Sequence, residues 1–236
     1  RKMLTSPLFL ILITFMLLSW VVSSRLKSKF RAYSKIPVNY GLTGRDVAEK
    51  MLRQNGLMNV QIVAVQGQLS DHYNPANRTV NLSPEVYHGR SVAAAAVAAH
   101  ETGHAIQHAN SYAFLEFRSA LVPLQNISAK VINFIFIGMM LGAFMLPGLL
   151  PFELAIQVII ACYGIFTLFA FITLPVEIDA SRRALAWLNT AGITTHETHP
   201  KAKDALKWAA YTYVVAALSS LVTLLYWVMV LTGSRD

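Results

Sequence analysis

Four long stretches of apolar residues divide the chain. None of them contains Asp, Glu, Lys or Arg, and each is long enough for a helix to cross a bilayer, which takes about 20 residues. They are residues 3–24, 131–152, 154–176 and 208–234. The sequence therefore predicts four transmembrane helices. Only Glu153 separates the second stretch from the third, and turn-forming Pro147, Gly148 and Pro151 lie nearby, which predicts a tight hairpin of two helices over residues 131–176.

Basic residues are distributed unevenly around these stretches. Lys and Arg cluster in residues 25–35 and 182–207, whereas the opposite side holds only three, Arg1, Lys2 and Arg235. Because loops rich in Lys and Arg stay in the cytoplasm, the N-terminus is expected outside and residues 25–130 and 177–207 inside. A cleaved signal peptide is the alternative reading of residues 3–24. It is disfavoured because its apolar part would be too long and a basic cluster follows it.

Composition agrees with a membrane protein. The mean hydropathy is +0.46 and 14% of the residues are charged, compared with about 25% in ordinary soluble domains. A net charge of +8 could indicate nucleic-acid binding, but no nucleic-acid motif accompanies it, so no nucleic-acid partner is predicted. The single Cys162 cannot form an internal disulfide.

Start and stop signals predict several helices in residues 25–130. Thr43 and Asp46 occupy the positions of a capping box, and the helix that they begin is expected to end at Gly56. Ser83 and Ser91 are expected to cap two further helices.

Strand patterns occur between these helices. Residues 60–65 alternate and are β-branched, which predicts a strand, and residues 68–73 and 79–82 flank a turn and predict a hairpin. The expected fold is therefore a mainly α membrane protein, in which four transmembrane helices carry a cytoplasmic α+β domain.

The motif His-Glu-x-x-His carries the candidate chemistry. His100 and His104 are four residues apart, so on a helix they share a face and can bind one zinc ion. Glu101 reaches toward the open coordination position, where it can act as general base on zinc-bound water. This predicts a zincin-like metallopeptidase domain with one catalytic Zn²⁺. Gly103 costs about 1 kcal/mol relative to Ala inside a helix, so it is expected to make room for a neighbouring backbone or for substrate.

The third zinc ligand is predicted from topology, because catalytic zinc usually has three protein ligands. The transmembrane hairpin returns the chain to the motif's side just before Glu177 and Asp179, at the start of a predicted cytoplasmic helix. Two residues apart on a helix, they point to nearly opposite faces. Asp179 can pair with Arg183, four residues on, so Glu177 is predicted as the ligand. The alternative is that Glu177 only favours the helix N-terminus electrostatically.

Other residues are candidates for supporting roles near the cleft. His72 and Tyr73 in the predicted hairpin could line the cleft or stabilise an oxyanion. His108 and Asp179 are expected to stand behind the ligands or to pack beside them. A metzincin would need Gly at position 107 and His at position 110, and Gln107 and Asn110 exclude that class.

Four segments together resemble the YugP-type bacterial neutral zinc metallopeptidases. These are His100 to His108, the stretch Asp71-His72-Tyr73-Asn74-Pro75, the stretch 82–87, and residues 174–183. The resemblance covers most of the chain and implies a membrane-bound zinc peptidase, hence a multi-pass protein of the bacterial cell membrane. A looser similarity links the chain to HtpX-type membrane proteases, which carry Asp four residues after the later Glu. Here that position is Ser181, so a carboxylate that would orient a histidine is missing or supplied from elsewhere.

Two function classes follow. The first is an endopeptidase that cleaves membrane proteins or peptides at the cytoplasmic membrane surface, with the lipid bilayer and a peptide substrate as partners. The second is a zinc-binding assembly factor or chaperone-like scaffold without proteolysis, against which the presence of Glu101 argues. A transporter is disfavoured because the predicted spans contain no ionisable residue. The sequence carries no indication of an oligomeric state.

Overall fold

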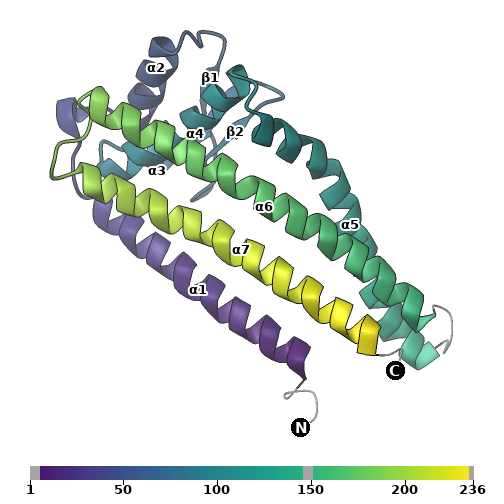
Figure 1. Cartoon of the computed structure of the whole chain (residues 1–236). Helices are drawn as coiled ribbons and strands as arrows, with labels where there is room; N and C mark the ends of the chain where they lie inside the picture. Colours follow the sequence, from purple (N-terminus) through teal and green to yellow (C-terminus); the bar gives the residue numbers. More distant parts are fainter. Residues whose placement is uncertain (1–5, 146–150, 234–236) are drawn as a thin grey trace. The chain divides into compact units, whose positions relative to one another are not determined.

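The computed structural model describes residues 6–145 and 151–233. Figure 1 draws the elements of the whole chain, which contacts divide into two compact units that are described separately. The first comprises Arg1–Trp20, Phe117–Thr173 and Tyr213–Asp236, and the second comprises Val21–Glu116 and Leu174–Thr212. The described residues form the elements α1 (Pro7–Tyr33), η1 (Asn39–Gly41), α2 (Gly44–Gln54), β1 (Gln61–Ala64), β2 (His72–Asn74), β3 (Thr79–Leu82), α3 (Pro84–Tyr87), α4 (Val92–Ala109), α5 (Ala113–Met145), α6 (Phe152–Thr190) and α7 (His199–Gly233).

Four helices are long and apolar enough to cross a membrane, as the sequence predicts. They contain the segments Pro7–Tyr33, Ala113–Gly138, Glu153–Thr190 and His199–Gly233. The second begins earlier than expected, because α5 is already helical from Ala113 and the predicted boundary at residue 130 falls inside it. The predicted turn residues Pro147 and Gly148, and the ends of the predicted spans at residues 3–5 and 234, lie outside the described residues.

Helix α6 differs from the prediction of a separate helix that begins at Glu177. It runs without interruption from Phe152 to Thr190 and includes Pro175. Proline removes one backbone donor, but helices of membrane proteins accommodate it because neighbouring groups satisfy the freed carbonyl. Glu177 consequently lies in the middle of a long helix. The alternative role at a helix N-terminus is wrong for that reason.

The sheet of the second unit has three strands in the order β1-β3-β2. Strand β1 confirms the predicted strand within residues 60–65 and pairs with β3 in parallel. Strands β2 and β3 form the predicted antiparallel hairpin, with His72 opposite Asn81 and Asn74 opposite Thr79. Since β2 lies at one edge of the sheet and contacts α4, the hairpin lies beside the helix that carries the His-Glu-x-x-His motif.

Helices begin directly after all three predicted capping residues, and two of the three cap the helix with their side chains. Thr43 and Asp46 form a complete capping box on α2, which is followed by Asn55 and by Gly56 at φ +72°. The Ser91 hydroxyl accepts a hydrogen bond from the Ala94 amide at the start of α4. Ser83 precedes α3 but does not cap it with its side chain, because its hydroxyl donates instead to the half-buried Asp71 carboxylate at 3.1 Å.

Helix α4 forms the centre of the second unit. Its alanine-rich first half packs against α2, α3 and the sheet, and its alanines are almost all buried. Small side chains allow the backbones of neighbouring elements to approach closely. At Gly103 a Cβ atom would lie 2.8 Å from the Ala180 carbonyl oxygen of α6, so the close approach of α4 and α6 requires glycine there. Gly103 therefore makes room for a neighbouring backbone, one of the two roles expected.

Candidate metal centre

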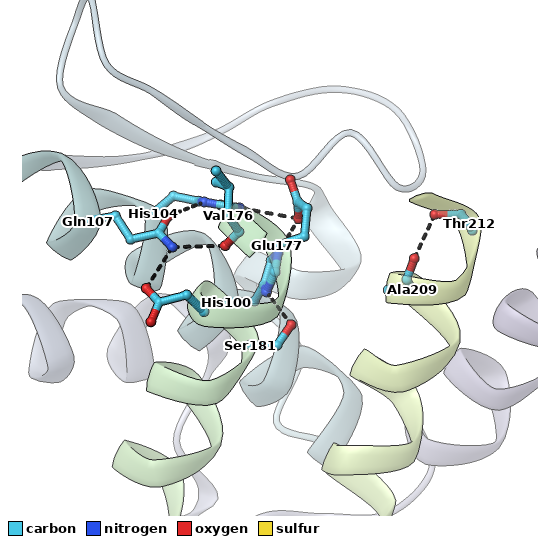
Figure 2. Close-up of polar contacts among 9 residues, drawn as sticks. His100, His104, Gln107, Val176, Glu177, Ser181, Ala209 and Thr212 are labelled. Atoms are coloured by element: carbon cyan, nitrogen blue, oxygen red, sulfur yellow. Dashed lines mark hydrogen bonds and ion pairs between the residues drawn. The ribbon is translucent and has the colours of Figure 1, made fainter. Parts of the chain in front are cut away.

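Three side chains of the second unit converge where α4 meets α6 (Figure 2). His100 and His104 lie one helical turn apart on α4, with ring centroids 4.8 Å apart. The Glu177 Oε2 atom lies 3.1 Å from His100 Nε2 and 3.5 Å from His104 Nε2. All three side chains are largely buried, with side-chain exposures of 13%, 10% and 4% in that order. Two helices thus bring together the three residues that the sequence suggests as metal ligands.

The donor atoms suit a zinc ion. Ligand atoms of the three side chains all lie within 4.8 Å of one another. Donors bound to one tetrahedral zinc at about 2.0–2.2 Å stand about 3.4 Å apart, close to the two separations between Glu177 and the imidazoles. Two imidazole nitrogens and one carboxylate oxygen are also a ligand set found in catalytic zinc sites, which keep a fourth position open. His100, His104 and Glu177 could therefore hold zinc with little rearrangement.

Gln107 fixes the orientation of His104. The Gln107 amide nitrogen donates to the Val176 carbonyl at 2.8 Å and to the Asp179 carboxylate at 2.9 Å. Both partners are acceptors, so the amide oxygen must face His104 Nδ1, 2.9 Å away. That oxygen can only accept, so Nδ1 carries the ring proton and the lone pair of Nε2 is left to face the centre. Figure 2 shows Gln107 between His104 and Val176.

Asp179 supports this arrangement instead of joining the centre. Its carboxylate accepts a hydrogen bond from Arg183 Nε at 2.6 Å, which is the pairing that the sequence suggests. The same oxygen accepts from Gln107. The sequence left open whether a carboxylate that orients a histidine is missing or supplied from elsewhere, and here Asp179 stands behind His104 through the Gln107 amide.

Ser181 is the corresponding partner of His100. Its hydroxyl lies 3.0 Å from His100 Nδ1, at the position where the HtpX-type pattern has Asp. A hydroxyl can donate or accept, so it holds the ring in place without dictating which nitrogen is protonated. Sequence reasoning did not recognise Ser181 or Gln107 as partners of the histidines. The available signal was their spacing, four residues after Glu177 and three after His104.

Glu101 lies on α4 beside the two histidines and is 9% exposed. Burial by itself lowers the pKa of His104, but the hydrogen bond and charge of Glu177, together with the charge of Glu101, outweigh burial and raise that pKa. In the metal-free protein the centre therefore favours positive charge at His104. A divalent cation would be stabilised by the same negative charges of Glu177 and Glu101.

The remaining predicted residues lie farther along α4 and in the hairpin. Tyr73 Oη and His108 Nδ1 are 2.8 Å apart, and both line a pocket of about 420 Å³ with Arg78. His72 is exposed, and its Nδ1 lies 2.8 Å from the Ser70 carbonyl oxygen. Tyr73 and His108 thus belong to a neighbouring pocket, whereas His72 contacts its own loop.

Comparison with known proteins places this geometry in a family. A family model described as "Putative neutral zinc metallopeptidase" matches residues 8–232. The chain belongs to this family. It is also 40% identical over 220 residues, 93% of this chain and 94% of the relative, to the "Putative membrane protease YugP" of Bacillus subtilis (strain 168). No solved structure matches the chain.

Membership in this zinc metallopeptidase family agrees with the cluster of His100, His104 and Glu177. The match extends over α1, α5, α6 and α7 as well as the second unit. The apolar helices are therefore part of the family's architecture and not an addition to it.

Proposed function

We propose that this chain is an integral-membrane zinc-dependent endopeptidase that cleaves membrane proteins or peptides at the cytoplasmic membrane surface. The observation that supports it most is the convergence of two imidazole nitrogens and one carboxylate oxygen within 4.8 Å, next to Glu101. A structural role alone would not require three buried ionisable side chains with a general base beside them.

Each residue has a distinct part in the proposed reaction. When bound, zinc supplies Lewis acidity that polarises the scissile carbonyl and lowers the pKa of water to about 7. Glu101 accepts a proton from the attacking water and delivers it to the leaving amine. Gln107 and Ser181 hold the two imidazoles in place through their Nδ1 atoms, so that the histidines need not reorganise during turnover.

The cytoplasmic orientation rests on the distribution of Lys and Arg. Basic residues cluster within the second unit at residues 25–35 and 182–207, and segments rich in Lys and Arg beside membrane spans stay in the cytoplasm. Cysteine labelling in intact cells tests this in a Cys162→Ala background. A cysteine at Ser70 should resist a membrane-impermeant reagent, and one at Pro151 should react. The reverse pattern would place the centre outside the cell.

The proposed chemistry is tested by Glu101→Gln, which removes the base and leaves all three candidate ligands. Purified full-length protein is assayed for zinc content and for hydrolysis of a mixed peptide library. We expect unchanged zinc content and a loss of hydrolysis of about 10²- to 10⁴-fold, the usual contribution of a general base. Glu197→Gln, at an exposed glutamate, is the matched control and should be fully active.

The same experiment separates the proposal from a non-proteolytic scaffold. A scaffold would bind zinc without cleaving any peptide in the wild type. Full activity of Glu101→Gln would instead reject the role of Glu101 as base.

A further inference from the structure

A groove of about 530 Å³ lies between α6 and α7 within the second unit. Its apolar lining includes Ile178 and Leu185 of α6 and Leu206 of α7. Ile178 is 47% exposed, so the groove presents open apolar surface.

Three cations border this apolar surface. Arg182, Lys203 and Lys207 line the groove, and no Asp or Glu lines it. In the described part of the chain, none of the three forms an ion pair. Lys207 only stands over the Tyr211 ring, at 5.5 Å. The groove therefore offers three cations without an ion-pair partner among the described residues, although the charges of Arg182 and Lys207 also act on the neighbouring carboxylates of Asp179 and Asp204.

Two basic residues near the groove do form ion pairs, unlike the three cations that line it. Arg183 is paired with Asp179 at 2.6 Å, and Lys29 with Asp204 at 2.8 Å. Acidic partners are thus available on α6 and α7, yet they are placed away from the groove. The ligand that complements the groove must carry negative charge at one end and apolar surface at the other.

The position of the groove along α6 and α7 indicates which kind of ligand fits it. Both α6 and α7 continue from it into segments apolar enough to cross a membrane. Along α6, Ile178 lies one turn closer to the apolar segment than Arg182 does, and along α7, Ala210 lies closer to the apolar segment than Lys203 and Lys207 do. A molecule at the boundary of the bilayer, with hydrocarbon below and an anion above, matches both features.

We propose that this groove binds an anionic phospholipid, with its phosphate against Arg182, Lys203 and Lys207 and the start of an acyl chain along Ile178 and Ala210. Basic side chains near a bilayer surface attract anionic lipid by electrostatics, and the apolar lining adds affinity for the chain. The groove would thereby hold the first helical turns outside the membrane at a fixed depth.

The test uses the purified full chain in detergent micelles and native mass spectrometry with phosphatidylglycerol or phosphatidylcholine of identical acyl chains. Wild type should prefer phosphatidylglycerol, and Lys203→Gln with Lys207→Gln should weaken its binding about tenfold or more. The matched control is Lys27→Gln with Arg31→Gln, which removes the same charge from a site lined otherwise only by serines. It should bind the lipid as wild type does.

Several results would overturn the proposal. Equal loss of binding in the control pair would mean that net charge alone attracts the lipid. Displacement of the lipid by equimolar glycerol phosphate would assign the groove to a free anion, and displacement by an acidic peptide would assign it to a protein substrate. Arg182→Gln is the second variant, should the double variant fail to give the circular dichroism spectrum of wild type. If either folded variant still preferred phosphatidylglycerol over phosphatidylcholine as strongly as wild type does, the proposal would also be rejected.

Discussion

His104 and His108 lie one turn apart on the same helix, yet their surroundings differ. His104 is 7% exposed and is held from both sides, by Glu177 at Nε2 and Gln107 at Nδ1. His108 contacts Tyr73 and lines a pocket of about 420 Å³. The difference comes from α6, which supplies the Glu177 carboxylate to His104 and two acceptors to Gln107, the residue that orients His104. A histidine becomes a candidate ligand here because of what a second helix brings to it.

The sharpest way to break this comparison is to remove each imidazole in turn. His104→Ala should abolish zinc retention, a larger loss than the about 10- to 100-fold that follows from removing an outer partner of a ligand. His108→Ala should retain zinc and weaken substrate binding by at most about tenfold, because it removes one hydrogen bond. Zinc analysis and KM measurements on both variants decide this. Zinc loss in His108→Ala would mean that the pocket around His108 and the metal centre around His104 are not distinct.

A second change separates α4 from α6 without touching a ligand. In Gly103→Ala the added methyl group would lie 2.8 Å from the Ala180 carbonyl oxygen, so the helices must move apart. Overpacking of this kind costs about 1–3 kcal/mol, and zinc affinity should fall because Glu177 moves with α6. Thermal unfolding and zinc titration measure the two effects. Gly138→Ala is the control, because no atom lies within 4 Å of its Cβ position.

Gln107→Leu tests whether the hydrogen bond to His104 Nδ1 contributes to zinc affinity and fixes the tautomer of His104. The change removes the acceptor at Nδ1 and leaves the Val176 carbonyl and Asp179 without the amide donor. Zinc affinity should fall by about 10- to 100-fold. Chelator competition gives the affinity, and imidazole ¹⁵N shifts should show mixed tautomers at His104. Gln54→Leu, which removes a hydrogen bond to Trp187, should leave both readouts unchanged.

The smallest expected effect is on how the thermal stability of the zinc-free protein depends on pH. In zinc-free protein the pKa of His104 is raised, with burial opposed and outweighed by Glu177 and Glu101. Its protonation therefore stabilises the fold fully below the unfolded imidazole pKa of about 6.5, and this stabilisation is lost as pH rises through the raised pKa. Thermal unfolding of chelated protein should show that loss. His104→Gln should remove this pH dependence, whereas His108→Gln should keep it.

Local rules in the sequence predicted much of this structure. The capping box of Thr43 and Asp46, the strand at β1 and the shared face of His100 and His104 all follow from short-range spacing. The proximity of Glu177 followed from topology, because the hairpin had to return the chain to the same side. These inferences needed no knowledge of how two helices contact each other.

Inter-helix contacts account for what the sequence did not predict. Gln107 acquires its role from the Val176 carbonyl and Asp179, and Ser181 from His100. The spacing of these residues to His104 and Glu177 marks them as neighbours of the ligands on their own helices, but it does not indicate these contacts with the other helix. The continuity of α6 through Pro175 likewise depends on neighbours that compensate a lost hydrogen bond, so a rule that ends helices near proline gave the wrong boundary.

The ligand environment of bound zinc tests the central claim most directly. Zinc K-edge X-ray absorption on the purified full-length protein should show two imidazole ligands at about 2.0–2.1 Å, oxygen ligands at about 2.0–2.2 Å and no sulfur. No bound zinc, and hence no zinc edge, should remain in His104→Ala, and the oxygen shell should be altered in Glu177→Gln. Zinc with no imidazole scattering, or a spectrum that neither substitution changes, would contradict a centre built from His100, His104 and Glu177.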